Sequence, residues 1–505
     1  MYCNSSVYLF GYQSCSYQDS SRVLFLPLNL AKLLVFSLSL TPLLLLSSFS
    51  VQALSVYTSQ TIEGTAPYLT FDGGRTRVTS TDSLLSIKLQ DGSVITPSTN
   101  TSSVSNPIRL PYAGNTLDDI DMIVPSSASS VDLSDLITRY NYWGDDDGDG
   151  QGTSGITATG RISVSFTDKD GNTFNRSDAL DICNAPYRVA LSSTGGSLTT
   201  QYGVPRSSSF SGAAVDYYIN PYNTVPRICH ARPNLEKGTE INGTGIHRGP
   251  SDIWNPDKGF LVQSTSPSSY NRNFPTTGAD GLYFDLDIGG IDASQLTWSS
   301  VARGGITATV TSVTPSDGWI PSIDRGKVVA RVKLSGPRAD STQINSSSPS
   351  PLAVPSLPQT FELVGRDGSG NEVRYGFVLK QWFVHRNKRT SFQFNQSTWC
   401  NSLGYRLARV RDLTNAICSG AMSGPFCQGS VGATPSSVFN GYQRHIGAGF
   451  FTEWGDMYGY ADAGFSNYYW TSDVSGRNGF NVQLVNGSVE NDSVNLMYNA
   501  VCTAP

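Results

Sequence analysis

Residues 361–384, FELVGRDGSGNEVRYGFVLKQWFV, contain two runs of alternating apolar and polar residues on either side of a glycine-rich turn. Alternation at every second residue places one set of side chains on one face of a strand, and Asp, Gly and Asn favour a tight connection. In the second run this alternation predicts that Val373, Tyr375, Phe377 and Leu379 are buried. The stretch therefore predicts an antiparallel hairpin with one buried face.

The same period-two pattern recurs along most of the chain. It is found in residues 83–94 (SLLSIKLQDGSV), 160–174 (GRISVSFTDKDGNTF), 281–290 (GLYFDLDIGG), 304–313 (GGITATVTSV) and 326–336 (GKVVARVKLSG). In the second of these, Ile162, Val164 and Phe166 share one face, and an Asp-Gly pair turns the chain back. We therefore predict a mainly β fold with one or two immunoglobulin-like antiparallel β-sandwich modules.

Composition excludes some functional classes. Only 15% of the 505 residues are charged, and the chain contains 49 Gly and 26 Pro, which is typical of exported β-rich proteins with many turns. The net charge of −5 does not provide the basic surface that nucleic-acid binding requires. The length predicts two to four domains, each with its own core.

The first 53 residues indicate export. An apolar run, VLFLPLNLAKLLVFSLSLTPLLLL, occupies residues 23–46, and Val51-Gln52-Ala53 has the small-residue pattern of a signal-peptidase site. We predict a signal peptide over 1–53 and a mature chain from Leu54, either secreted or on the cell surface. The alternative is an uncleaved membrane anchor, because the run is long enough to span a bilayer. Membrane contact is expected only through this leader or an unknown anchor.

Six cysteines remain in the mature chain, and they are expected to form three disulfides in an oxidising compartment. They are Cys183, Cys229, Cys400, Cys418, Cys427 and Cys502. Six cysteines allow fifteen connectivities, so the sequence does not fix the pairing. The first two lie in one β-rich region and the other four lie near the C-terminus. No pair has CxxC spacing, and only His230 stands beside a cysteine, so zinc binding is not indicated.

The character of the chain changes after residue 385. Residues 394–404 (FNQSTWCNSLG) predict a short helix ending at Gly404, 409–417 predict a second helix, and 467–473 (NYYWTSD) and 479–489 predict strands. We divide the mature chain into an N-terminal β-sandwich region over 54–187, a second β-rich region over 188–385 and an α+β domain over 386–505. A Cys400–Cys502 bridge would join the start of the last domain to its end, and Cys418–Cys427 would close one loop.

The last domain resembles bacterial C-type-lectin-like domains. The motifs that carry the resemblance are Cys400, Gly404-Tyr405-Arg406-Leu407, Arg411-Asp412-Leu413, Glu453-Trp454-Gly455, Tyr469-Trp470-Thr471-Ser472 and Asn499-Ala500-Val501-Cys502. Together with the preceding β regions, the chain resembles the adhesion-domain family of enterobacterial invasin- and intimin-like surface proteins. That resemblance implies an adhesin that binds a protein or glycan on a host cell or neighbouring cell. The Glu-Pro-Asn and Gln-Pro-Asp triplets of calcium-dependent sugar binding are absent.

One acidic loop is a candidate metal site. In residues 143–152, WGDDDGDGQG, Asp145, Asp147 and Asp149 alternate with other residues before Gly150, as in the first half of a calcium-binding loop. The twelfth position counted from Asp145 is Ile156, so the closing bidentate Glu of that motif is missing. The loop is therefore either a structural calcium site or a solvated turn.

An aromatic segment of the last domain is the candidate ligand-binding surface. The residues that we assign to ligand contact are Glu453, Trp454, Asp456, Tyr458, Tyr468 and Trp470. Rigid aromatic side chains give a large contact area at low entropic cost. The competing interpretation is that about half of the aromatic residues in this segment belong to the core.

No catalytic motif is found. The four histidines are scattered, and GxSxG, HExxH and Walker motifs are absent, so we predict that the chain is not an enzyme. The main alternative is a secreted carbohydrate-active enzyme with a carboxylate pair, for which Asp285 and Asp287 are the residues to consider. A third possibility is a purely structural secreted protein.

Overall fold

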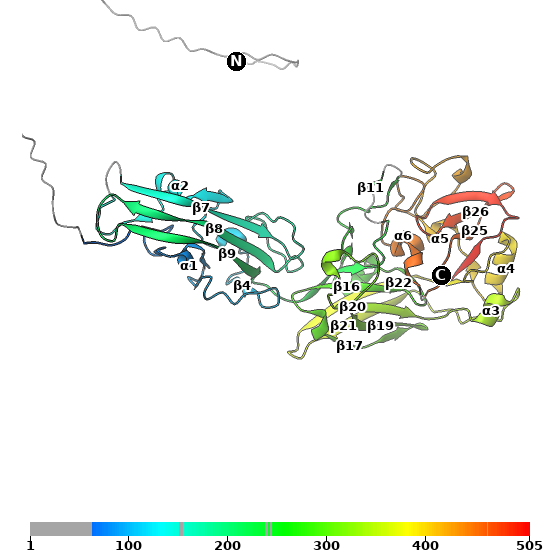
Figure 1. Ribbon diagram of the computed structural model, residues 1–505. Coiled ribbons are helices and arrows are strands. Elements are labelled where there is room, and N and C mark those ends of the chain that lie inside the picture. Colours follow the sequence, from blue (N-terminus) through cyan, green and yellow to red (C-terminus); the bar gives the residue numbers. More distant parts are fainter. Residues whose placement is uncertain (1–62, 151–154, 238–240, 243–244, 462, 505) are drawn as a thin grey trace, which may run out of the picture. The chain divides into compact units, whose positions relative to one another are not determined.

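The computed structural model describes residues 63–150, 155–237, 241–242, 245–461 and 463–504 (Figure 1). These residues belong to one unit of the chain, Thr61–Pro505. The predicted signal peptide over 1–53 lies outside the described residues. Within the described ranges, none of the helices combines the length and apolar character needed to cross a membrane.

The first part of the described chain, up to residue 220, builds a five-stranded sheet (Figure 1). Its order is β4 (Ile108–Arg109), β9 (Ser207–Asn220), β8 (Tyr187–Thr200), β7 (Ile156–Thr167) and β5 (Ser130–Asp132). The pairings are antiparallel except for that of β4 with β9. The predicted domain limit at residue 187 coincides with the start of β8, so the sheet that contains β7 continues to the end of β9.

Short elements cover the buried face of this sheet. They are α1 (Thr81–Leu84), α2 (Leu133–Thr138), η1 (Leu117–Asp119), and the ladders β1 (Tyr68–Leu69) with β6 (Trp143–Gly144) and β2 (Ile87–Lys88) with β3 (Val94–Ile95). Leu84 and Leu136 pack in the same core as Ile162 and Val164, which confirms the inward face predicted for β7. The second layer is thus built from helical turns and short ladders, because turn-forming residues interrupt the sequence before residue 150.

The middle of the chain forms a sandwich of two sheets. The larger sheet has the order β13 (Trp254–Asn255), β14 (Gly259–Leu261), β10 (Arg227–Arg232), β16 (Tyr283–Gly289), β20 (Val329–Ser335), β19 (Ile306–Val313) and β18 (Val301–Arg303). The smaller sheet has the order β17 (Thr297–Trp298), β21 (Gln359–Arg366) and β22 (Glu372–Leu379). Phe284 of β16 meets Phe377 of β22 edge to face, with ring centroids 6.1 Å apart. The predicted sandwich and the predicted inward face of β22 are both confirmed.

The C-terminal part is an α+β unit around a second seven-stranded sheet. Its order is β15 (Thr277–Ala279), β23 (Gln381–His385), β28 (Asn499–Ala504), β25 (Tyr468–Ser475), β26 (Asn478–Gln483) and β27 (Val489–Ser493), with β24 (Arg406–Leu407) also paired with β28. The last strand of the chain therefore lies inside the sheet. Two strands of this sheet, β15 and β23, come from residues before 386.

Helical elements flank these sheets. The longest in the C-terminal unit is α4 (Gln393–Ser402), which ends before Gly404 at φ +88°, as predicted. The other helical elements after residue 385 are α5 (Val410–Leu413), α6 (Phe450–Trp454), η5 (Pro425–Cys427) and η6 (Met457–Gly459). Those between residues 226 and 385 are α3 (Ser341–Asn345), η2 (Pro267–Arg272), η3 (Ala293–Gln295) and η4 (Ser322–Asp324). A short ladder joins β11 (Ile241–Asn242) to β12 (Gly245–Ile246). The predicted second helix is only one turn because the backbone is extended from Thr414 onward.

Three disulfides confirm the predicted use of all six cysteines. Cys183–Cys229, Cys400–Cys502 and Cys418–Cys427 have Cα–Cα separations of 5.7, 5.4 and 5.3 Å. The first connects the segment before β8 to β10, the second joins α4 to β28, and the third closes a small loop. The ends of the C-terminal unit are therefore covalently joined, as the resemblance implies.

One hydrophobic core serves both the sandwich and the C-terminal unit. It extends from Ile228 of β10 to Ala504 of β28 without interruption, whereas the first sheet has a separate core. Phe383 of β23 stacks on Phe450 of α6 with ring centroids 4.2 Å apart. The sandwich and the C-terminal unit are consequently parts of one folding unit.

Candidate functional site

Glu453, the first of the predicted contact residues, is fully buried in α6. Its carboxylate accepts hydrogen bonds from Thr276 and Thr277, each of which donates its backbone N–H and its hydroxyl, and from the backbone N–H of Gly447. The donor distances lie between 2.5 and 3.1 Å. Burial raises the pKa of Glu453, and the five donors act against that rise. The residue fastens α6 to β15 and makes no contact with solvent.

Three further predicted contact residues are also in the interior. Trp454 is buried and donates its indole N–H to the carbonyl of Thr277 at 3.0 Å. Trp470 is buried and donates its indole N–H to the carbonyl of Ser391 at 3.1 Å. Asp456 is nearly buried and caps η6 through the backbone N–H of Tyr458. The structure thus corrects the prediction. The side chains of Glu453 and Trp454 hold α6 against β15, and Trp470 packs in the core, so none of the three is available to a ligand.

Tyr458 and Tyr468 are the predicted contact residues that remain accessible. Tyr458 is half-exposed and forms a hydrogen bond with Asn467. Tyr468 is partly exposed at the start of β25, and its ring lies 5.5 Å from that of Tyr498. They keep their candidate role, although the surrounding aromatic cluster is core.

A buried arginine completes the joint between the sandwich and the C-terminal unit. Arg444 is fully buried and donates to the carbonyls of Asn234, Glu236 and Glu453. Its guanidinium also lies 4.6 Å from the ring centroid of Trp254. Because each buried donor is expensive to leave unsatisfied, these contacts make the joint specific to this arrangement.

Sequence reasoning missed a group of large exposed apolar residues in the C-terminal unit. Phe394 of α4 is 78% exposed and Met497 is 58% exposed, and Phe392 and Leu496 are about half-exposed. A signal for Phe394 was present in the sequence. The buried side of α4 carries Gln396, Trp399, Cys400 and Leu403, and Phe394 lies out of phase with that helical stripe.

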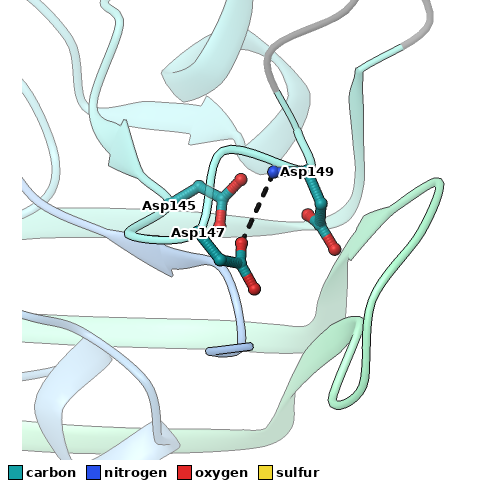
Figure 2. A group of neighbouring side chains, drawn as sticks. All are labelled: Asp145, Asp147 and Asp149. Carbon is teal, nitrogen blue, oxygen red and sulfur yellow. Dashed lines mark hydrogen bonds between the residues drawn. The ribbon is translucent and has the colours of Figure 1, made fainter. Parts of the chain in front are cut away.

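The acidic loop brings its three alternating carboxylates together (Figure 2). It follows β6, and Asp145, Asp147 and Asp149 each offer one oxygen atom, all within 4.8 Å of one another. Asp145 accepts from the backbone N–H of Gly150 at 2.7 Å, and Asp147 accepts from that of Thr65 at 2.8 Å. The loop therefore holds these carboxylates on one side of its turn.

The intervening Asp146 has a different environment. It pairs with Arg77 at 2.5 Å and accepts a hydrogen bond from the hydroxyl of Tyr68 at 3.0 Å. Ile156, at the position of the missing closing ligand, is the first residue of β7. The cluster thus contains three carboxylates and no fourth acidic ligand among the residues that the structure describes.

The chemistry of the cluster fits an oxygen-liganded cation. One oxygen of Asp145 and both oxygens of Asp149 are buried without a hydrogen-bond partner within the described chain. Burial, followed by the hydrogen bond with Asp147, raises the pKa of Asp145 to about 6. A divalent cation would supply the missing partner to these oxygens and offset the repulsion between like charges.

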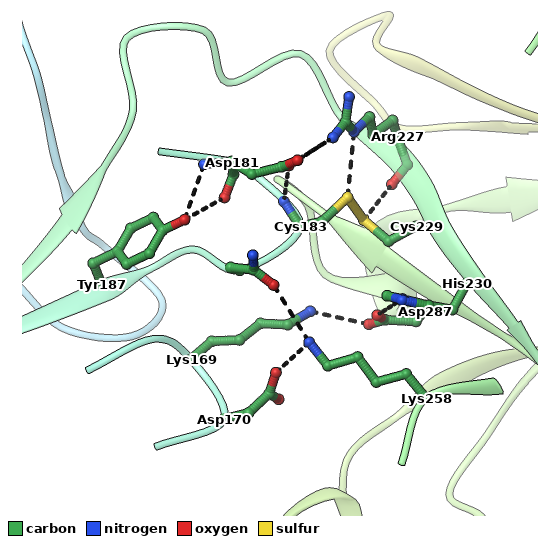
Figure 3. The surroundings of a disulfide bond; sticks show 11 residues. Lys169, Asp170, Asp181, Cys183, Tyr187, Arg227, Cys229, His230, Lys258 and Asp287 are labelled. Atoms are coloured by element: carbon green, nitrogen blue, oxygen red, sulfur yellow. Dashed lines mark hydrogen bonds and ion pairs between the residues drawn. A yellow bond between two sulfur atoms is a disulfide. The ribbon is translucent and has the colours of Figure 1, made fainter. Parts of the chain in front are cut away.

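The Cys183–Cys229 disulfide lies in a network of ion pairs (Figure 3). Arg227 pairs with Asp181 at 2.6 Å beside the bridge. Lys258 pairs with Asp170 in the same surroundings. Since Asp170 belongs to the turn after β7 and Lys258 precedes β14, the network links the first sheet to the sandwich.

The carboxylate pair considered for glycoside hydrolysis belongs to this region. Asp285 is buried and receives two hydrogen bonds from Arg331, at 2.7 and 2.9 Å. The carboxylate of Asp287 accepts a hydrogen bond from Lys169 at 3.0 Å and is hydrogen-bonded to Nδ1 of His230 at 2.9 Å. Burial acts to raise the pKa of Asp287, but His230 and Lys169 lower it below its usual range. Each carboxylate therefore has a structural role in an ion pair.

Comparison with known proteins gives structural matches only. No protein-family model matches the chain, and the search of curated proteins gives no significant match. An invasin described as a bacterial integrin-binding protein matches with 12% identity and a TM-score of 0.33, over 69% of this chain and 50% of that chain. The chain therefore spans about half the length of that invasin structure.

Intimin structures match in the same way. A C-terminal 282-residue intimin fragment, solved with the intimin-binding domain of the translocated intimin receptor, has 12% identity and a TM-score of 0.30, over 69% of this chain and 86% of that chain. An intimin mutant from EHEC O157:H7 has 13% identity and a TM-score of 0.25, over 50% and 93%. Invasin and intimin are also the proteins that the sequence resemblance names.

Proposed function

We propose that the chain is an exported adhesin whose C-terminal α+β unit binds a protein or glycan on a host cell or neighbouring cell. The observation that carries the proposal is the Cys400–Cys502 bridge, which joins α4 to the interior strand β28. It supports the resemblance because both of its cysteines belong to the motifs that carry the resemblance. The three disulfides support an oxidising location outside the cytoplasm.

The C-terminal unit also offers side chains suited to recognition. Phe394 and Met497 expose apolar surface on a unit whose core is otherwise complete. The alternative of a carbohydrate-active enzyme needs a carboxylate pair free to act on a sugar, whereas Asp285 and Asp287 are both ion-paired. We therefore propose binding without catalysis.

This function can be tested by shielding one end of the protein at a time and measuring adhesion to cells. Ser436→Cys places a thiol on the exposed surface of the C-terminal unit, and Ser127→Cys places one on the first sheet unit. A long polyethylene glycol chain attached to each thiol shields the surface around it. We expect particles coated with residues 61–505 to bind a panel of epithelial and bacterial cells saturably. The Ser436 conjugate should lose most of this binding and the Ser127 conjugate should keep it.

The two conjugates control for each other because both carry the same polymer. Circular dichroism and thermal unfolding establish that neither substitution disturbs the fold. Equal loss in both conjugates, or loss only in the Ser127 conjugate, contradicts a C-terminal binding end. Absence of saturable binding by the unmodified chain to every cell type contradicts the adhesin proposal itself.

We also propose that the loop of Asp145, Asp147 and Asp149 binds a structural calcium ion. The support is the convergence of the three carboxylates and the unpartnered oxygens of two of them. Exported proteins meet millimolar calcium, so a weak site is sufficient. The ion would stiffen the connection between β6 and β7.

Calcium should raise the thermal stability of the protein, measured by fluorimetry in calcium and in chelator. At a hundred-fold excess over Kd, one site adds about 2.7 kcal/mol to the free energy of unfolding. Asp147→Asn and Asp149→Asn should each abolish the response. Asp146→Asn is the matched control, because this carboxylate pairs with Arg77, and it should retain the response. An unchanged melting temperature of the unsubstituted protein in calcium contradicts the site.

The calcium response should also depend on pH in a defined direction. The pKa of Asp145 rises from 3.8 to about 6, so between these values the folded chain holds a proton that the unfolded chain has released. Without calcium, stability therefore falls as pH rises through this interval. Calcium needs the deprotonated carboxylate, so the stability gained from calcium should increase from pH 5 to pH 7. A gain that decreases over this range contradicts the assignment of Asp145 as a ligand.

A further inference from the structure

A polar hollow of about 770 Å³ lies beside the N-terminal half of α4. It is lined by the turn that carries Lys388 and Arg389 and by Phe394 and Met497. Its volume is in the range of sites that hold a ligand or a short segment of a partner. A second hollow of about 430 Å³ adjoins it, lined by Phe392 and again by Phe394. Phe394 therefore stands between the two hollows.

Five of the side chains around the two hollows supply either apolar surface or positive charge. We define the Phe394 surface as Phe392, Phe394, Met497, Lys388 and Arg389, all of which are exposed. Aromatic residues, Met and Arg are the types enriched at the centres of protein interfaces. A flexible Met beside a rigid Phe also adapts to apolar groups of varied shape. This composition is typical of a protein-binding surface.

The base under the Phe394 surface is rigid. Gln396 is fully buried and donates to the carbonyls of Arg389 and Tyr498, at 2.9 and 2.7 Å. Its side-chain oxygen accepts from the guanidinium of Arg386 at 3.0 Å. Tyr498 pairs in turn with Ser391 through two backbone hydrogen bonds of 3.0 and 3.1 Å. The turn, the start of α4 and the segment before β28 are thus held together before any partner binds, which lowers the entropic cost of association.

The positive charge of the hollow is not balanced by any acidic residue among its described lining residues. The guanidinium of Arg386 is used by the carbonyls of Ile344 and Ser346 and by Gln396, so it forms part of the base. Lys388 and Arg389 are exposed, and no acidic residue lines the hollow within the described ranges. Burial and then the neighbouring charge of Arg389 lower the pKa of Arg386. The hollow is therefore positively charged, although the chain as a whole has a net charge of −5.

We propose that the Phe394 surface binds an acidic segment of a partner protein, with an apolar side chain of that segment seated against Phe394 and Met497. Carboxylates beside that side chain would pair with Lys388 and Arg389. The inference rests on the proposed adhesin function and specifies where the C-terminal unit makes its contact. A protein segment fits better than an anionic glycan because the exposed Phe and Met side chains require an apolar group to cover them.

Peptide display provides the probe. A random twelve-residue peptide library is selected on immobilised chain 61–505, and the enriched peptides are synthesised for binding measurements by fluorescence anisotropy. We expect Asp and Glu to be enriched on both sides of Leu, Phe or Met. Phe394→Ala and the double substitution Lys388→Glu/Arg389→Glu should each weaken binding by about ten-fold or more. Raising the salt concentration should weaken binding to the unsubstituted chain.

Arg411→Glu/Arg477→Glu is the matched control for charge. Both arginines are exposed on the same unit and neither lines the two hollows, so this double substitution changes the net charge equally. It should leave peptide affinity within about two-fold, since neither arginine lines a hollow and exposed charges are screened by salt. Enriched peptides without acidic residues, or peptides whose affinity is the same for the unsubstituted chain and the Phe394→Ala variant, overturn the proposal. A library that yields no binder overturns it as well.

Two further measurements separate this inference from the function on which it rests. If polysialic acid binds, and only Lys388→Glu/Arg389→Glu abolishes that binding while no peptide is enriched, the surface is a carboxylated-sugar site and the protein assignment is wrong. If coated particles adhere to cells through the C-terminal unit but Phe394→Ala particles adhere equally well, the adhesin function stands and the Phe394 surface is excluded. If the peptides bind as expected but no cell is bound, the surface stands and the adhesin function fails.

Discussion

Glu453→Gln is expected to destabilise the sandwich and the C-terminal unit together by roughly 3 kcal/mol or more. The carboxylate of Glu453 faces five donors, and both of its oxygens accept from backbone N–H groups. An amide NH2 group in place of either oxygen would point a donor at donors. Backbone N–H groups cannot turn away as a hydroxyl can, so the conflict cannot be relieved by rotation.

Urea unfolding followed by tryptophan fluorescence measures this effect. Trp382, Trp399 and Trp454 are all buried in the shared core, so the signal reports on the affected part of the chain. Glu372→Gln is the matched control because Glu372 forms surface ion pairs with Arg366 and Arg374, and its midpoint should hardly move. An unchanged midpoint for Glu453→Gln would show that Glu453 does not fasten α6 to β15.

Patterns formed by neighbouring residues correctly predicted several strands and a helix. Alternation gave the buried faces of β7 and β22, and the helix signal before Gly404 gave α4. The grouping of cysteines by region agrees with the three bridges. Each of these features needs only a few neighbouring residues or a simple count, which is why sequence alone was sufficient.

The candidate contact residues depended on information that is not local. Thr276 and Thr277, the partners of Glu453, lie 177 and 176 residues away from it in the sequence. Strict alternation in the strand 467–473 would bury either Tyr469 or Trp470, but both are buried. The reason is that β25 lies between β28 and β26 and both of its faces are covered there, so period two no longer separates inside from outside.

Residues 386–505 expressed alone are expected not to fold, although they include the whole of the lectin-like resemblance. The fragment lacks β23, which pairs with β28 along Trp382, Phe383 and Val384, three buried core residues. It also lacks Thr276 and Thr277, so four of the five donors to Glu453 are absent. A central strand would become an edge, and a buried carboxylate would lose most of its partners.

The buried guanidinium of Arg444 would also lose hydrogen-bond partners in this fragment. Arg444 would keep the carbonyl of Glu453 but lose those of Asn234 and Glu236, and the indole of Trp454 would lose Thr277. Unsatisfied buried groups of this kind each cost about 1 to 3 kcal/mol, so their sum is comparable with the roughly 5 to 15 kcal/mol of stability that a domain commonly has. Near-ultraviolet circular dichroism and proton NMR should therefore show no fixed tertiary packing in the fragment.

Residues 226–505 with Cys229→Ser are the matched comparison and should fold. This fragment retains the whole shared core, β15, β23 and every partner of Glu453. It loses the first sheet with its separate core and the ion-pair partners Lys169 and Asp170, but Asp287 keeps its hydrogen bond with His230. The serine removes the thiol left unpaired when Cys183 is absent. A cooperative thermal transition in 226–505 and none in 386–505 would establish that the C-terminal unit cannot be separated from the sandwich. A cooperative transition in 386–505 alone would show instead that the C-terminal unit folds without β15 and β23, and that the shared core is a contact between two independent domains.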